Sequence, residues 1–184
     1  MSKIHDPLLS PALEEAPAGS RPALERLRTS VGMIPNLAAA MSASPALIEG
    51  FVAVREAFHR STLRPIERET LALANAVENG CRYCTAIHAT FASKAGLDAA
   101  EIERVRSKST PNDPRLAALT ALGRALIRER GQPSEAVLER FLAAGFSREQ
   151  VLEVVLGVGL STLANYAGHL TGVGPDDAIR AQYR

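Results

Sequence analysis

The chain of 184 residues has no tryptophan, only 4% aromatic residues in all, and a formal net charge of +1. Its basic residues are interspersed with acidic ones, and no basic stripe carries aromatic side chains between its charges. Tight binding of nucleic acid requires a positively charged surface that neutralises phosphates. The composition therefore gives no support to a nucleic-acid partner.

Long uncharged apolar runs are also absent. The longest candidate, residues 154–168, is shorter than the roughly 20 residues that cross a bilayer, and Asn165 interrupts it. The first residues, with Lys3 and Asp6, lack the apolar core of a secretory signal peptide. We therefore expect no membrane insertion and a location in the reducing cytoplasm.

Cysteine is rare, since the chain has only two, in one Cys81-x-x-Cys84 pair. A disulfide between them would close a very short ring, which constrains the unfolded chain little. A structural zinc ion usually takes four protein ligands, and the chain has no third cysteine. The histidines are His5, His59, His88 and His169. In a reducing compartment a vicinal pair is more often redox-active or metal-binding than structural, so the pair favours thiol redox chemistry, with zinc as the weaker alternative.

A histidine and a glutamate are placed to serve this pair. If residues 81–95 form a helix, as the Asn-Gly dipeptide before them indicates, both cysteines and His88 share one face of it. His88 can take a thiol proton, and the positive end of the helix favours a thiolate. Glu69, on the preceding apolar helix, can fold back across the turn and orient His88. Taken singly, His88 would more often be a core histidine and Glu69 an exposed residue, so the prediction depends on all four residues together.

The pattern of Glu69, eleven residues and then Cys81-x-x-Cys84-x-x-x-His88 resembles the catalytic motif of a known family, the alkyl hydroperoxidase D-like branch of the carboxymuconolactone decarboxylase superfamily. The similarity runs from about residue 31 to residue 169. The segments 32–36, 44–45 and 63–69 also resemble the family's lead-in to the motif. The sister decarboxylases lack the cysteine pair, which makes lactone decarboxylation a weak candidate.

The resemblance implies an all-α, single-domain helical bundle that assembles as a homo-oligomer, a trimer or a hexamer. It implies that the cysteines cycle between dithiol and disulfide while a small hydroperoxide is reduced. Glu69 and His88 would form the proton relay, and an unidentified thiol reductant would restore the dithiol. No metal or cofactor is expected, because the cysteines carry the two electrons. Where the best-known members have a second histidine between the cysteines, this chain has Tyr83, which removes a titrating group beside the thiols.

Proline and glycine positions divide the chain into an arm, a helical domain and a tail. Residues 1–28 contain four prolines and predict an extended arm with at most a short helix near 22–28. Residues 29–175 form the predicted helical domain, and residues 176–184 form a C-terminal tail. Prolines at starts and glycines at ends predict the helices of the domain. The expected helices are a short one from Asn36 and then 45–59, 65–78, 81–95, 99–107, 114–129, 134–144 and 148 to about 170.

Two of these helices have distinctive apolar patterns. Leu119, Leu122 and Leu126 lie on one stripe of 114–129, which predicts an amphipathic surface helix. Residues 151–163 are apolar almost all round, which predicts a central helix or one buried in a subunit contact. With the proline-rich arm, this helix is a candidate surface for the oligomer.

An internal echo points to a pseudo-repeated helical core. A shift of 81 positions aligns His88 with His169 and Cys84 with Asn165. The second copy would have lost the thiols, with His169 capping the fold or lining the entrance to the site. The alternatives are a chance match between two amphipathic helices and, for His169, an ordinary hydrogen-bonded histidine near a helix end.

The predicted mechanism starts with His88, oriented by Glu69, promoting the Cys84 thiolate, which attacks the peroxide before Cys81 closes the disulfide. The reverse assignment stays open, because in thioredoxin-type proteins the first cysteine is the exposed nucleophile. Two other functions would use the same residues. One is a dithiol–disulfide oxidoreductase that serves a partner protein, and the other is a non-catalytic oligomer that senses oxidation. A cysteine-based peroxidase is the expected activity.

Overall fold

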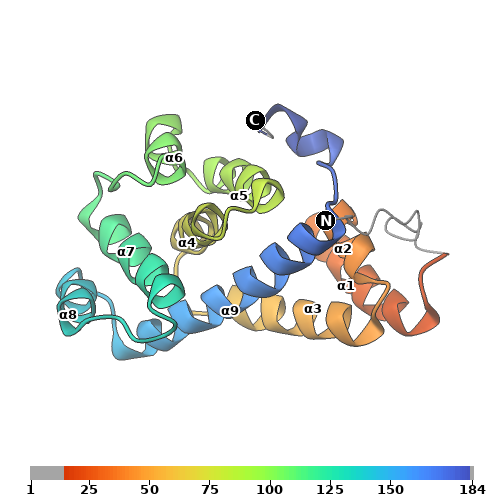
Figure 1. Ribbon diagram of the computed structural model, residues 1–184, viewed down its shortest axis with the longest axis horizontal. Helices are drawn as coiled ribbons and strands as arrows, with labels where there is room; N and C mark the ends of the chain where they lie inside the picture. The colour runs from red at the N-terminus through yellow and green to blue at the C-terminus, as the bar shows by residue number, and fades with distance from the viewer. Residues whose placement is uncertain (1–14, 183–184) are drawn as a thin grey trace.

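The computed structural model describes residues 15–182, and this part of the chain is helical without a strand (Figure 1). The elements are η2 (Ala18–Ser20), α1 (Arg21–Val31), α2 (Asn36–Met41), α3 (Pro45–His59), α4 (Pro65–Glu78), α5 (Arg82–Lys94), α6 (Ala99–Arg106), α7 (Pro114–Arg128), α8 (Glu135–Ala143), α9 (Arg148–Thr171) and η3 (Asp177–Gln182). The expected all-α bundle is confirmed.

Local sequence signals fix most of the helix ends. Pro45, Pro65 and Pro114 are the first residues of α3, α4 and α7, where the fixed φ of proline suits the first turn. Ser147 caps α9 with its hydroxyl, which accepts the Gln150 N–H at 3.2 Å. From α3 onward every helix therefore begins and ends within one residue of its expected bounds.

The N-terminal helix is longer than expected. Instead of stopping near residue 28, α1 continues to Val31 and ends at Gly32, whose φ of 86° is left-handed. Leu24 and Leu27 are buried, because this face of α1 packs on α3. Helix α1 thus crosses the boundary expected for the arm, and residues 1–14 of that arm lie outside the described residues. At the other end, η3 lies within the expected tail and contacts α5.

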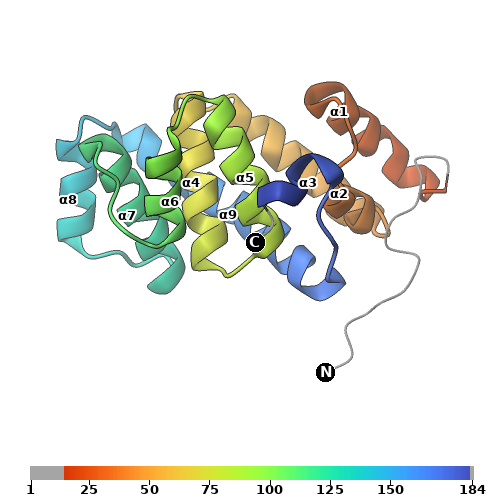
Figure 2. The same cartoon turned by 90° about the horizontal axis from the view of Figure 1, so that it is seen from above.

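Helix α9 is the central element of the described chain. It runs along the molecule and contacts α2, α3, α4, α5 and α7 (Figure 1), which confirms the expected central helix. Helices α4 and α5 lie side by side, with α1 to α3 on one side of them and α6 to α8 on the other (Figure 2). A Cβ atom at Gly157 of α9 would lie 2.8 Å from the Phe58 ring and 3.0 Å from Leu71. Glycine therefore lets α3, α4 and α9 meet at close range, beside the site described below.

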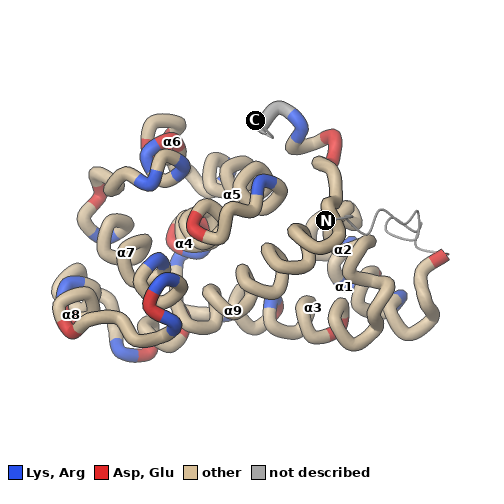
Figure 3. Tube along the Cα trace, viewed as in Figure 1, with Lys and Arg blue, Asp and Glu red and all other residues tan. Residues whose placement is uncertain are grey.

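The outer face of α9 is apolar. Beyond Glu153 the helix carries no Lys, Arg, Asp or Glu, whereas charges are spread over the other helices (Figure 3). By length and composition α9 could cross a membrane, a test that the core helix of a water-soluble protein also passes. Several large side chains of this face are exposed, namely Leu152, Val155, Leu163, Tyr166 and Leu170. An apolar face of this kind is typical of a contact surface.

The internal echo does not correspond to a repeated two-helix unit. The first stretch contains a break at Gly80, whose φ is 72°, between α4 and α5. The position aligned with Gly80 is Ser161, which continues α9 without interruption. The two stretches therefore share a pattern of side chains and differ in backbone path, because only the first stretch has the glycine that turns the chain.

Candidate active site

Cys81 and Cys84 lie at the N-terminus of α5. The left-handed Gly80 turns the chain from α4 into α5 and places Cys81 at the N-cap position. The Cys81 sulfur accepts a hydrogen bond from the Cys84 N–H at 3.5 Å. This is the end of the helix where backbone N–H groups favour a negative charge.

The two thiols are free, buried and electrostatically linked. A hydrogen bond from the Cys84 thiol, backbone N–H groups and the positive charge of His169 lower the pKa of Cys81 to about 6, against the opposing effect of burial. The same hydrogen bond, together with burial, raises the pKa of Cys84. These shifts favour a reduced pair that has lost one proton at neutral pH, with the negative charge mainly on Cys81.

We expect the ultraviolet absorbance of a thiolate to appear in the reduced protein with a midpoint near pH 6. Cys81→Ser should remove this transition. Cys84→Ala should move the midpoint upward, because it removes the thiol that donates to Cys81. A transition near pH 6 that persisted in Cys81→Ser would place the charge on Cys84 instead.

His88 and Glu69 meet across the α4–α5 pair, as the sequence predicted. His88 Nδ1 lies 2.9 Å from Glu69 Oε2. Burial alone would raise the pKa of Glu69, but the hydrogen bond with His88 and electrostatic interactions with His88, His59 and Arg55 outweigh burial and lower it. The ionised carboxylate accepts a hydrogen bond from Nδ1–H, so in the neutral ring the proton stays on Nδ1 and Nε2 is unprotonated. Nε2 is then available to a group in the pocket.

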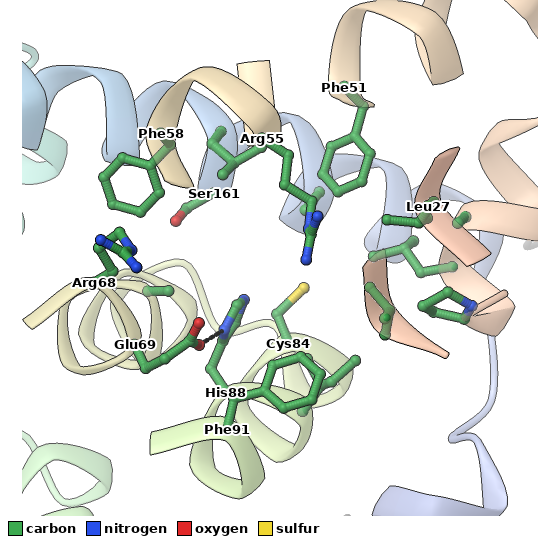
Figure 4. A pocket seen from close by; sticks show the side chains of 18 of the residues that line it. Leu27, Phe51, Arg55, Phe58, Arg68, Glu69, Cys84, His88, Phe91 and Ser161 are labelled. Carbon is green, nitrogen blue, oxygen red and sulfur yellow. Dashed lines mark hydrogen bonds and ion pairs between the residues drawn. The ribbon is translucent and has the colours of Figure 1, made fainter. Parts of the chain in front are cut away.

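A pocket reaches Cys84 and His88 (Figure 4), and its empty space, together with open solvent at its mouth, amounts to about 840 Å³. Most of its walls are apolar side chains from α1, α3, α5 and α9, such as Leu27, Phe51, Phe91 and Leu160. Cys81 is not among the residues that line it. The pocket therefore offers a ligand access to one sulfur of the pair, that of Cys84.

Asn165 of α9 is a polar partner of Cys84. Its side chain is buried and forms a hydrogen bond with the Cys84 sulfur, which opposes the rise in the pKa of that thiol. Asn165 Oδ1 accepts a hydrogen bond from Asn79 Nδ2 at 2.8 Å, so its own N–H₂ group is left to donate to the sulfur. The sequence indicated Asn165 only through the echo with Cys84, which says nothing about a hydrogen bond.

Tyr83, between the cysteines, is fixed in its protonated form. Burial and the hydrogen bond that its hydroxyl donates to Asp176 raise the pKa of Tyr83. The other oxygen of Asp176 accepts the Asn36 N–H at 2.8 Å, so one carboxylate ties the C-terminal segment to α5 and α2. Tyr83 has a structural partner here and adds no titrating group near neutral pH.

The four residues predicted from the sequence thus lie in one place, with Cys84, His88 and Glu69 on the pocket and Cys81 behind them. Within residues 15–182 no group of three His, Cys, Asp or Glu side chains is arranged to hold a metal ion. The sequence did not point to Arg55 and Arg68, which also line the pocket. No local pattern could have shown this, because it depends on how α3 and α4 pack.

Comparison with known proteins agrees with this fold. The model of the carboxymuconolactone decarboxylase family matches residues 45–122, a range that includes all four predicted residues. No curated protein matches the chain. An uncharacterized peroxidase-related protein from Ralstonia eutropha JMP134, described as an alkylhydroperoxidase AhpD core, superposes with a TM-score of 0.83 at 21% identity over 100% of this chain and 98% of that one.

Two further solved structures have the same fold. A peroxidase-related protein from Silicibacter sp. TM1040 gives a TM-score of 0.80 at 21% identity, over 100% of this chain and 97% of its own. A cysteine-to-alanine variant of the debrominase Bmp8 in complex with 2,3,4-tribromopyrrole gives a TM-score of 0.80 at 14% identity, over 98% of this chain and 97% of its own. At such low identities the likeness establishes the fold and leaves the reaction to be argued from the site.

Proposed function

Because the chain belongs to the carboxymuconolactone decarboxylase superfamily and has an alkyl hydroperoxidase D-like fold, we propose that it is a thiol peroxidase that reduces hydroperoxides with the Cys81–Cys84 dithiol. The observation that carries the proposal is the position of Cys84 on the wall of an apolar pocket. His88, held by Glu69, lines the same pocket. A nucleophile, a base and an orienting carboxylate are together there.

In the first step Cys84 attacks the peroxide. His88 Nε2 accepts the Cys84 proton, since Glu69 holds the opposite ring nitrogen in its protonated form. The thiolate attacks one peroxide oxygen, the O–O bond breaks, and Cys84 becomes a sulfenic acid. The leaving alkoxide takes the proton from His88 and departs as the alcohol.

In the second step Cys81 closes the disulfide. As the thiolate of the pair, it attacks the Cys84 sulfur and expels hydroxide, which leaves as water with the proton that Cys81 had released. The net reaction converts a dithiol and a hydroperoxide into a disulfide, an alcohol and water. An external thiol then reduces the disulfide by exchange.

The test is peroxide consumption supported by dithiothreitol under metal-free conditions. We expect the wild type to turn over hydrogen peroxide or an organic hydroperoxide continuously. We expect Cys81→Ser to complete a single turnover and stop at a Cys84 sulfenic acid, which dimedone labels for mass spectrometry. A wild type that forms a reversible disulfide but consumes no peroxide would contradict the proposal and favour a redox sensor.

Burial of the cysteines favours a small thiol as the reductant over a protein. Cys81 is only 2% exposed and Cys84 only 1%, and of the two only Cys84 lines a pocket. A partner protein's cysteine would need the helices around the pair to move. Disulfide exchange with a thioredoxin-type protein that outpaced exchange with dithiothreitol would instead favour the partner-serving oxidoreductase.

Reductive debromination is a second candidate reaction, favoured by the apolar, aromatic-lined pocket and by the debrominase with the same fold. A dithiol supplies the two electrons needed to replace bromine by hydrogen, which gives a disulfide and hydrogen bromide. Release of bromide from a bromopyrrole at a rate exceeding peroxide consumption would make this the primary activity.

A homo-oligomer is part of the proposal. Subunit contacts would cover the exposed apolar face of α9, which includes Leu152 and Leu170.

A further inference from the structure

The pocket that reaches Cys84 carries an excess of positive charge. Its charged lining residues are two arginines, Arg55 of α3 and Arg68 of α4, and one carboxylate, Glu69. Glu69 is already the hydrogen-bond partner of His88. Two guanidinium groups therefore face a largely apolar space with a single carboxylate, and that carboxylate is already hydrogen-bonded to His88.

Arg55 is a half-buried cation without a close counter-ion. No carboxylate of the described residues lies within ion-pair distance of it, and Glu69 and Glu56 act on it only at longer range. Its Nη1 donates a hydrogen bond to Ser30 Oγ at 3.1 Å. Burial lowers the pKa of this guanidinium, which nonetheless stays charged at neutral pH. Figure 4 shows it reaching from α3 into the space above Cys84.

Arg68 lies on the other side of the same space. Its Nη1 donates to the Leu63 carbonyl, but its buried Nε–H has no hydrogen-bond partner. A buried donor without a partner is costly unless a ligand or water satisfies it. Arg68 thus adds positive charge and an unused donor beside Glu69 (Figure 4).

The sulfur on the pocket wall, that of Cys84, does not supply the missing counter-charge. The thiolate of the pair is Cys81, which does not line the pocket, whereas Cys84 carries the proton. An anion that enters the pocket with an apolar body would neutralise the excess charge and cover the apolar walls at the same time.

We infer that the pocket binds carboxylate-bearing organic molecules, with the Arg55 guanidinium holding the carboxylate by charge-assisted hydrogen bonds and the apolar walls holding the hydrocarbon. This inference rests on the proposed peroxidase function for its reaction. The preferred substrates are then hydroperoxides of organic acids, with the hydroperoxyl group against Cys84.

Binding tests the inference without any turnover. Octanoate and octanamide have the same chain and differ in charge, and calorimetry on the reduced wild type compares their dissociation constants. We expect octanoate to bind at least about tenfold tighter at neutral pH. Arg55→Met should remove this preference and leave octanamide binding unchanged, and Arg55→Lys should retain part of it. Arg60→Met, an exposed residue next to α3 outside the pocket, is the matched control and should bind both as the wild type does.

Equal affinities of the wild type for the two ligands would overturn the inference, and so would an Arg55→Met protein that weakens both alike. If the protein has no peroxidase activity but still binds octanoate more tightly than octanamide, the proposed function is overturned and the inferred anion site is supported. Where turnover is present, a linoleic acid hydroperoxide and its methyl ester separate the roles of Arg55. Arg55→Met should raise KM for the acid alone. An equal fall in kcat for both would mean that Arg55 acts on the sulfur and would overturn the inference.

Discussion

Cys84→Ser is expected to reduce peroxide consumption to the uncatalysed rate, even though it leaves the more acidic thiol in place. Cys81 is the thiolate of the pair, with a pKa of about 6, but it does not line the pocket. Cys84 does, beside His88. Because a nucleophile must reach the peroxide oxygen before its pKa matters, access should decide the outcome. Single-turnover kinetics with excess protein over peroxide measure this directly.

Glu69→Gln should lower peroxide turnover only in part, in contrast to the complete loss expected for Cys84→Ser. It keeps the shape of the side chain and removes the charge that holds His88, so we expect turnover to fall by about 10²-fold, with the fold unchanged by circular dichroism. If Cys84→Ser consumed one equivalent of peroxide and left a sulfenic acid on Cys81, the roles of the two cysteines would be reversed. If Glu69→Gln were as active as the wild type, the carboxylate would have no part in the relay.

The helices could be predicted because their ends are encoded locally. Proline at the first position of α3 and α4, and glycine after α9, act within a few residues of the chain. Helix α1 was underestimated because its neighbouring prolines suggested an extended arm, whereas burial of Leu24 and Leu27 keeps it helical. Tertiary packing overrode a local signal there.

The candidate site was predictable to the extent that it lies on one helix and one turn. Spacing alone relates Cys84 to His88, and the short turn after α4 brings Glu69 to them. Arg55 and Asn165 come from α3 and α9, so their places depend on contacts between helices distant in sequence. Residue spacing carries no information on such contacts, so the chemistry of the two sulfurs can be predicted from the sequence and the pocket beside Cys84 cannot.

Apart from the family motif, nothing in the local sequence distinguishes the role of Glu69 from that of Glu67, two residues earlier. Glu67 is fully buried, and its Oε1 accepts from Arg115 Nε at 2.6 Å and from Arg64 Nε at 2.9 Å. Its Oε2 accepts the backbone N–H of Arg64 at 2.8 Å and so caps α4. The partner that gives Glu67 its structural role is Arg115, which lies 48 positions away on α7. The Arg115 Cζ atom stacks 3.7 Å from the centroid of the Phe146 ring.

Glu67→Ala is therefore expected to lower the free energy of unfolding by about 3 kcal/mol. This value is near the lower end of the range for a broken buried ion pair, because both arginine side chains are partly exposed and water can solvate them in the variant. Hydrogen bonds from the two arginines outweigh burial and lower the pKa of Glu67. This stabilisation is complete above the unfolded-state pKa and is lost as pH falls through the lower folded value, so the difference between variant and wild type should narrow in acid. Urea denaturation at neutral and acidic pH measures both effects.

Glu25→Ala, which breaks an exposed pair with Arg28, is the matched control and should cost less than about 1 kcal/mol. Equal costs for the two variants would mean that the Glu67 network adds no stability. Residues two apart lie on different faces of a helix, so Glu67 faces α7 while Glu69 faces α5. A folded Glu67→Ala protein should accordingly keep its kcat, because the carboxylate that holds α4 in place and the carboxylate that holds His88 act on opposite sides of the same helix.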